Sequence, residues 1–286
     1  MNQFFISTDT GADLPEHYCH SHEISVLPLP VNMDGQTYLG NELDVKAFYQ
    51  KLREGSLPTT SAANLEDTSN LFRRILSQGH DLLHIAFSSG LSSTANAAFL
   101  AAEQIRAEFP DRELIVVDSL CASLGQGLLV HQAVKLRSQR LSLAETGKRI
   151  EDMKLNMVHN FTVDDLNHLH RGGRVSKATA VVGTLINIKP VLHVDDQGHL
   201  VAVGKARGRR ASIQALIKRM EQQVAGFDKE EVFISHGDCP EDAEYLAQLV
   251  RERFGIDNIM VDYIGPTIGT HSGPGTLALF FLGSPR

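Results

Sequence analysis

The chain has 286 residues, of which 42% are hydrophobic, and it carries a net charge of −7. That length is enough for one large domain or two medium domains, each able to bury a core. The acidic balance argues against nucleic acid as a partner, because nucleic-acid binding depends on a basic surface. Three widely spaced cysteines give no disulfide framework, and we see neither a signal peptide nor an apolar run of membrane-spanning length. We therefore expect a cytoplasmic protein.

In the first half of the chain, short apolar runs alternate with helical patterns. Strands are predicted at residues 4–7, 82–87 and 114–117, and the helices after the last two extend to about residues 107 and 137. Strand, polar loop and helix in repetition are typical of a mainly parallel sheet covered by helices. Ligands of such sheets bind where the carboxyl ends of the strands meet the loops, and the Ser- and Gly-rich segments fall there.

The second half begins near Leu155 and has a different pattern. A β-hairpin is predicted over Val191–Val203, because an Asp-x-Gly turn lies between alternating apolar residues. A strand followed by a polar loop is predicted over 231–238, and a helix from about Glu241 to Phe254.

Two loops rich in hydroxyl groups are candidates for binding an anion. Residues 88–94, Ser-Ser-Gly-Leu-Ser-Ser-Thr, lead into a helix whose free N–H groups and dipole favour negative charge. Ordinary N-capping by Ser92 or Ser93 is the alternative interpretation. Residues 58–62, Pro-Thr-Thr-Ser-Ala, form the second cluster, and a capped loop is again the alternative.

Residues 265–275 are the least generic stretch, since four glycines and two prolines surround one histidine. Such a loop allows the main chain to approach a ligand closely. His271 could donate to an anion or transfer a proton. A tight structural turn that merely contains a histidine is the alternative.

Basic residues gather in two segments, 168–177 and 205–210. Arginine suits carboxylates and phosphates, so these segments could contact an acidic or phosphate-carrying partner; a solvated surface is the alternative. His17–His22 resembles a metal site, but zinc ligands usually come as pairs from two separated segments and no companion pair stands out. We expect a polar helix end there and no metal.

Several sharper motifs are absent from the sequence. It has no Walker A pattern, no G-x-G-x-x-G after a strand, no G-x-S-x-G elbow and no H-E-x-x-H. Nucleotide-binding and hydrolase functions therefore lack their usual signatures.

Six segments, in order along the whole chain, resemble the DegV family of bacterial fatty-acid-binding proteins. They are residues 8–15, Thr60-Ser61, Ser88–Thr94, Asp118–Gly127, Leu169–Ser176 and Ile264–Gly275. The last is close to the family signature I-G-P-V-I-G-T-H-x-G-P-G, and the fifth to L-x-R-G-G-R-I-S. The chain departs at Ser93, where the family usually has glycine, which adds a side chain at the helix entry.

The resemblance implies an α/β protein of two domains with a lipid tunnel. Residues 1–155 would form a three-layer domain with a parallel sheet, and residues 156–286 a second α/β domain. The implied function is to bind one long-chain fatty acid, with no other cofactor, and to present it to a separate ATP-dependent fatty acid kinase. The acyl phosphate would then pass to an acyltransferase of phospholipid synthesis, so the chain itself would not be an enzyme.

The resemblance also assigns residues to roles. The fatty-acid carboxylate would be held by Thr60, Ser92 and His271, supported by Ser61, Ser93, Gly269 and Thr270. The kinase or the phosphate would be contacted by Arg171, Arg174 and Arg207. Two other functions stay open from the residues themselves: a serine hydrolase or acyltransferase using Ser92 with His271, and a sensor of a small anion or nucleotide.

Overall fold

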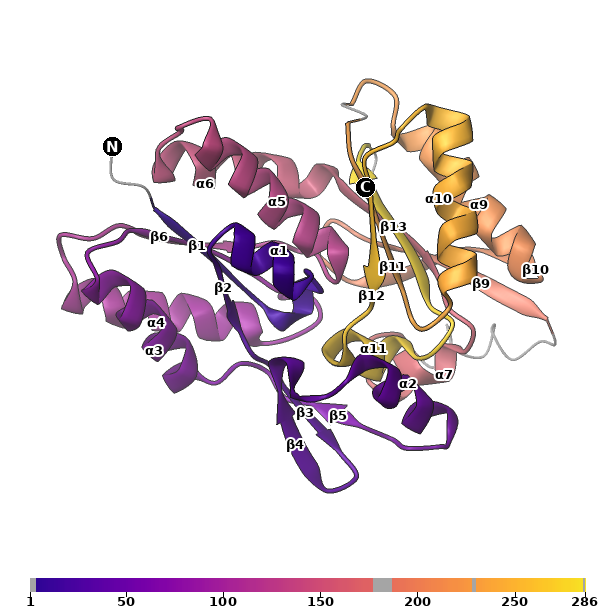
Figure 1. Cartoon of the computed structure of the whole chain (residues 1–286), viewed down its shortest axis with the longest axis horizontal. Coiled ribbons are helices and arrows are strands. Elements are labelled where there is room, and N and C mark those ends of the chain that lie inside the picture. The colour runs from indigo at the N-terminus through magenta and orange to yellow at the C-terminus, as the bar shows by residue number, and fades with distance from the viewer. Residues whose placement is uncertain (1–3, 177–186, 228–229, 285) are drawn as a thin grey trace.

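The computed structural model describes residues 4–176, 187–227, 230–284 and 286. Its strands form three sheets, and helices cover and separate the two larger ones (Figure 1). No helix in these ranges has the length and apolar character that crossing a membrane requires.

The first sheet is parallel, with the strand order β2-β1-β6-β7. Its strands are β1 (Phe5–Asp9), β2 (Ile24–Leu27), β6 (Leu82–Ala86) and β7 (Leu114–Asp118). The helices around it are α1 (Glu16–Ser21), α3 (Leu65–Ser77), α4 (Thr94–Glu108), α5 (Leu124–Ser138) and α6 (Leu143–Met153). Helices α3 and α4 pack on one face of the sheet and α5 and α6 on the other, which makes three layers. All five residues of β6 are buried, as expected for a strand covered on both faces.

The second sheet is mixed, with the order β10-β9-β8-β13-β11-β12. Its strands are β8 (Met157–Thr162), β9 (Ile188–Val194), β10 (Leu200–Arg207), β11 (Val232–His236), β12 (Ile259–Tyr263) and β13 (Leu277–Leu282). Among the described pairings in this sheet only β11 and β12 run parallel. Its outer face is covered by α9 (Arg209–Gln223) and α10 (Pro240–Phe254).

A small antiparallel sheet extends from the first half of the chain (Figure 1). It consists of β3 (Pro30–Met33), β4 (Gln36–Leu39) and β5 (Thr59–Thr60), with α2 (Val45–Arg53) packed beside it. Phe48 and Tyr49 of α2 are fully buried, and Tyr49 Oη donates to the Ile264 carbonyl at 2.8 Å. This extension is therefore fixed to the second half of the chain.

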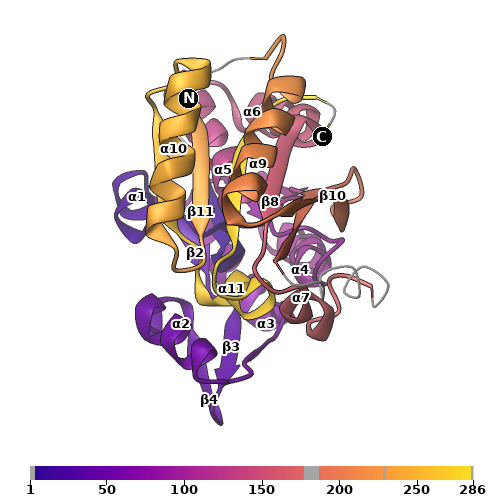
Figure 2. The same ribbon diagram turned by 90° about the vertical axis from the view of Figure 1, so that its right-hand side faces the viewer.

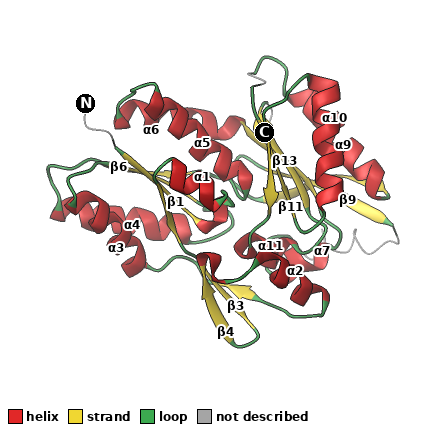
Figure 3. Ribbon diagram, viewed as in Figure 1, coloured by secondary structure: helices red, strands yellow, loops and turns green. Residues whose placement is uncertain are grey.

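Helix α5 lies between the two large sheets, as the ribbon coloured by secondary structure shows (Figure 3). Its apolar side chains share one core with Ile85 of the first sheet and with Phe161 and Phe280 of the second. Two short helices, α7 (Leu166–Arg171) and α11 (Pro266–Ser272), contact each other at one end of the second sheet (Figure 2). Short 3-10 turns span Thr10–Ala12, Gly40–Glu42 and Lys154–Asn156.

The predicted fold class is confirmed: a parallel sheet in three layers is followed by a second α/β unit. The three predicted strands, the hairpin and the last long helix are present within four residues of their predicted bounds. The domain limits at 155 and 156 stay a prediction, because α5 belongs to a core that both sheets share. The small sheet and, apart from the hairpin, the antiparallel pairing of the second sheet were not predicted.

Candidate functional site

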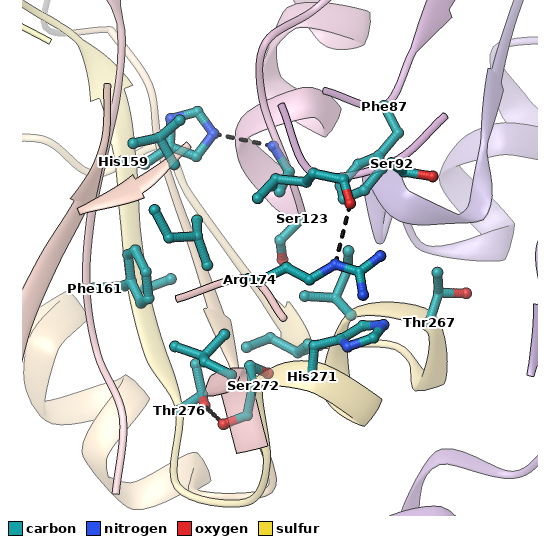
Figure 4. Close-up of a pocket in the computed structure, with 18 of the residues that line it drawn as sticks. Phe87, Ser92, Ser123, His159, Phe161, Arg174, Thr267, His271, Ser272 and Thr276 are labelled. Carbon is teal, nitrogen blue, oxygen red and sulfur yellow. Dashed lines mark hydrogen bonds between the residues drawn. The ribbon is translucent and has the colours of Figure 1, made fainter. Parts of the chain in front are cut away.

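A cavity of about 90 Å³ lies where the two large sheets, the small sheet and α11 meet (Figure 4). Most of its wall is hydrocarbon, contributed by side chains such as Leu29, Phe87, Leu91, Phe161, Ile268 and Phe280. These residues come from both halves of the chain, so the cavity exists only when the two halves are packed together.

The two strands at the centre of the second sheet show how the cavity extends. Ala278 is paired with Phe161, and Phe280 with His159, and all four side chains line the cavity. Residues at positions i and i+2 of a strand face the same side, so the cavity follows β8 and β13 away from α11. The wall is thus an elongated apolar surface with one end at α11.

The polar groups at the α11 end come from three separate elements. Thr60 ends β5, Ser92 precedes α4, and His271 lies in the last turn of α11. The hydroxyl of Thr60 lies 2.7 Å from Nε2 of His271, and all three residues line the cavity. The structure therefore brings together the three residues that the resemblance assigned to carboxylate binding.

Helix α11 is held so that one face points into the cavity. Pro266 occupies its first turn, where its missing N–H costs nothing. Thr267, Ile268, His271 and Ser272 all line the cavity, which is the i, i+1, i+4, i+5 spacing of one helical face. The histidine is thus delivered to the cavity by helix geometry.

Ser92 and His271 do not form the pair that a serine hydrolase needs. The Ser92 hydroxyl lies 2.9 Å from the Thr94 hydroxyl and accepts from the Thr94 N–H at 3.2 Å, while His271 is bonded to Thr60. A nucleophile needs its general base within hydrogen-bond reach. The geometry therefore favours Ser92 as a binding group.

His271 is neutral at pH 7. Burial of the ring, reinforced by the nearby charges of Arg174 and Arg171, lowers the pKa of His271 to about 4. A neutral imidazole carries one N–H donor and one acceptor nitrogen. The ring can therefore take part in a hydrogen-bond network without adding a buried positive charge.

The three arginines assigned to the kinase or the phosphate occupy different positions. Arg174 lines the cavity and donates from Nε to the Leu91 carbonyl at 3.1 Å, so it spans the two halves of the chain. Arg171 is exposed at the end of α7 and donates to His168 Nδ1 at 2.9 Å. Arg207 is exposed at the end of β10. Of the three, Arg174 is the one placed to reach a ligand in the cavity.

The four supporting residues also have distinct environments. Ser61 lines the cavity mouth and is exposed, and Ser93 is exposed at the N-cap position of α4 without a side-chain capping bond. Gly269 and Thr270 are buried in α11, where Thr270 bonds the Pro266 carbonyl at 2.8 Å. The last two therefore support the helix that carries His271.

Five polar residues of the wall were missed from the sequence: Ser123, His159, Thr267, Ser272 and Thr276. His159 is almost fully buried; its ring bonds the Met157 carbonyl at 2.9 Å and the Ala122 N–H at 3.2 Å, so it faces the cavity with carbon atoms. Ser123 bonds Asp13 and Ser235. The buried hydroxyl of Ser272, by contrast, has no hydrogen-bond partner among the described residues, although the Ser272 carbonyl accepts from the Thr276 hydroxyl at 2.8 Å. Alternation along β8 was the one available signal for His159.

The histidine-rich segment lies outside this site. His17 and His20 are exposed on α1, and the described residues contain no group of three His, Cys, Asp or Glu side chains arranged to hold a metal.

Fold and site together define an α/β protein with two large sheets, whose apolar cavity ends in hydroxyl and imidazole groups, an arrangement suited to an amphipathic small molecule. A family model described as DegV, uncharacterised protein, matches residues 3–284. The chain therefore belongs to the DegV family. A DegV domain-containing protein of Clostridium perfringens is 43% identical over 100% of this chain and 99% of its own length. One of Lactococcus lactis is 38% identical over 97% of this chain and 96% of its own length.

Solved structures are similar over the same extent. A DegV family protein from Thermus thermophilus, described by its fatty acid binding, has a TM-score of 0.89 at 32% identity, covering 99% of this chain and 100% of its own. DegV of Bacillus subtilis, described as a fatty acid binding protein, has a TM-score of 0.85 at 29% identity, with the same coverage.

Proposed function

We propose that this protein binds one long-chain fatty acid in the cavity, with the carboxylate at the α11 end. The observation that carries the proposal is the cavity itself: an elongated hydrocarbon wall that ends at Thr60, Ser92 and His271. The fatty acid binding described for the Thermus and Bacillus relatives supports it.

The polar end offers what a buried carboxylate requires. An ionised carboxylate is costly to bury unless hydrogen-bond donors surround it. Thr60 and Ser92 supply hydroxyl groups, and the guanidinium of Arg174 supplies positive charge within the same wall. Hydrogen bonds to a charged group each contribute roughly 1.5–3 kcal/mol, so losing one donor should be measurable.

The apolar part supplies most of the affinity, but the cavity must widen to accept a long chain. Each buried methylene contributes about 0.8 kcal/mol. Pockets that enclose drug-sized ligands measure about 300–1,000 Å³, whereas this one measures about 90 Å³. The side chains along the seam between the two sheets therefore move apart when the acid enters.

The protein acts in the cytoplasm as a carrier, and a separate ATP-dependent kinase phosphorylates the bound acid. The acyl phosphate then passes to an acyltransferase of phospholipid synthesis. The sequence supports this division of labour, since it contains no nucleotide-binding motif of the common types. Arg171 and Arg207, both exposed, are the side chains we assign to the kinase contact or the transferred phosphate.

Calorimetric titration with palmitate and with oleate tests the binding proposal. We expect one acid per chain for the wild type. Ala278→Leu fills part of the cavity beside Phe161, so it should abolish binding while the protein stays folded. Binding that survives this substitution unchanged would place the ligand elsewhere.

Incubation with ATP, magnesium and oleate tests the carrier proposal. We expect no acyl phosphate from this protein alone. Acyl phosphate formed in the absence of any partner would show that the chain is itself a kinase.

A further inference from the structure

The end of α7 contains two adjacent glycines that are needed for different reasons. Gly173 N–H bonds the His170 carbonyl and Arg174 N–H bonds the Leu169 carbonyl, both at 2.9 Å. These bonds form a Schellman cap, and Gly173 supplies its left-handed residue with φ of +76°. Gly172 ends the helix with φ of −71°, a conformation open to any residue. The backbone conformation therefore does not explain why residue 172 is a glycine.

The close approach of the His271 ring explains why residue 172 is a glycine. A Cβ atom at this position would lie 2.2 Å from Nδ1 of His271 and 3.2 Å from its Cε1. Such a separation is far inside van der Waals contact, so the imidazole rests directly on the glycine backbone. The relation is reciprocal, because a Cβ on Gly273 at the end of α11 would lie 2.5 Å from Cδ2 of His168 on α7. The two helix ends interlock through these contacts.

The position of the His271 ring against Gly172 also determines which ring nitrogen carries the proton. Nδ1 is buried and has no hydrogen-bond partner among the described residues, whereas Nε2 lies 2.7 Å from the Thr60 hydroxyl. Nδ1 has no partner in either tautomer, but a buried N–H without an acceptor is less well tolerated than a buried acceptor without a donor. The neutral ring therefore holds its proton on Nε2 and donates it to Thr60.

The position of this proton determines what the Thr60 hydroxyl can offer to a ligand. Once the Thr60 oxygen accepts from His271, its own hydrogen is left to donate. No other hydrogen bond of the Thr60 hydroxyl is present within the described ranges. Thr60 can then donate to a carboxylate oxygen in the cavity.

We propose that Gly172 is a positioning residue: the space it leaves fixes His271 as a neutral Nε2–H donor, which makes Thr60 a donor to the bound carboxylate. The part concerning the carboxylate rests on the proposed function, whereas the part concerning the ring does not. The same contact ties the arginine-bearing end of α7 to the head-group end of the cavity.

A double-mutant cycle on the full chain tests this, using Gly172→Ala, His271→Ala and both together. Palmitate affinity is measured by calorimetry, and the histidine tautomer by nitrogen chemical shifts in NMR. We expect Gly172→Ala to weaken palmitate binding about tenfold or more and to abolish the Nε2–H signature of His271, since a lost hydrogen bond to a charged group has that size. In the His271→Ala background, which has room for the new methyl, Gly172→Ala should change affinity less than about twofold.

Gly204→Ala is the matched control, since a Cβ there has its nearest neighbour at 3.8 Å, and it should leave affinity and tautomer unchanged. Unchanged affinity and tautomer in Gly172→Ala would overturn the proposal, as would equal losses in both backgrounds. If Gly172→Ala alone does not fold, the double variant decides. A double variant that folds as His271→Ala does supports the contact between Gly172 and His271, and a double variant that fails to fold refutes it. A wild type that binds no palmitate refutes the proposed function, while the tautomer measurement still tests the contact between Gly172 and His271.

Discussion

At the scale of single residues, the site depends on a short chain of polar contacts in a hydrocarbon wall. Thr60 and His271 are 211 positions apart in the sequence, yet their side chains are 2.7 Å apart. Ser92 reaches the same cavity from the loop before α4. Because each group is positioned by a different element, a change at one should leave the other two in place.

Thr60→Val and Ser92→Ala should each lower palmitate affinity by about tenfold or more, because each removes a donor to a buried charge. Valine keeps the shape of threonine, so the fold should persist, although the His271 N–H then loses its acceptor. If the two contacts are independent, the double variant should show the product of the two effects. Calorimetric titration of the three variants checks this. Wild-type affinity in all of them would show that the carboxylate does not bind at this end of the cavity.

The family motifs predicted this part of the site, because residues 60, 92 and 271 are of the same types as the residues of those motifs. The same motifs assigned Arg174 to the kinase or the phosphate, and the structure places that side chain in the cavity wall. The orientation of a long side chain depends on which carbonyl it meets, here that of Leu91. A contact across 83 positions leaves no local pattern in the sequence.

At the scale of elements, α11 carries His271 at the polar end of the cavity, and it packs against α2. A Cβ on Gly269 would lie 2.7 Å from both Phe48 Cε1 and Tyr49 Oη. Both aromatic side chains are fully buried and have little space to move. The glycine in this helix is therefore a packing requirement.

Gly269→Ala should destabilise the protein, although alanine normally favours a helix by about 1 kcal/mol over glycine. Overpacking against fixed aromatic rings costs about 1–3 kcal/mol, so packing should outweigh helix propensity. The substitution should also displace His271, two residues further on, and weaken palmitate binding. Thermal unfolding and titration check both effects; an unchanged or raised Tm with normal binding would show that α11 is not tightly seated on α2.

The elements themselves were predictable to different degrees. Strand β6 and its flanking strands were predicted correctly because buried parallel strands are rich in apolar residues along their length. The small sheet was missed, since β5 has two residues and the pattern of β4 is mostly exposed. Strand β5 forms by pairing with the separated strand β3, which periodicity within one segment does not reveal, whereas the β3–β4 hairpin has a local signal in its Asp34-Gly35 turn.

At the scale of the whole molecule, the two halves are joined by a shared core and by buried polar contacts. Asp13, from the loop after β1, accepts from the Ser123 hydroxyl at 2.6 Å and from the Gly265 N–H at 3.0 Å. It thereby links the first sheet, α5 and the loop before α11. Burial raises the pKa of Asp13 to about 8, with smaller contributions from Asp262 and Asp9.

This carboxyl group should make the stability of the fold depend on pH. Its folded pKa lies above the usual 3.8, so the folded state holds the proton more tightly. The resulting stabilisation is complete at acid pH and is lost as the pH rises from about 4 through 8. Asp13→Asn cannot ionise and keeps an acceptor for Gly265, so its stability relative to the wild type should improve steadily over that range.

Urea unfolding of the wild type and of Asp13→Asn from about pH 5 to about pH 9 measures this difference. A constant gap between the two proteins would mean that Asp13 titrates normally in the folded state.

We propose that the cavity holds one long-chain fatty acid by its carboxylate. Native mass spectrometry of the freshly purified protein, followed by extraction and identification of any bound lipid, tests it most directly. We predict a mass excess of one long-chain fatty acid per chain, which is lost in Thr60→Val combined with Ser92→Ala. A protein that carries no lipid and takes up neither added palmitate nor added oleate would contradict the account.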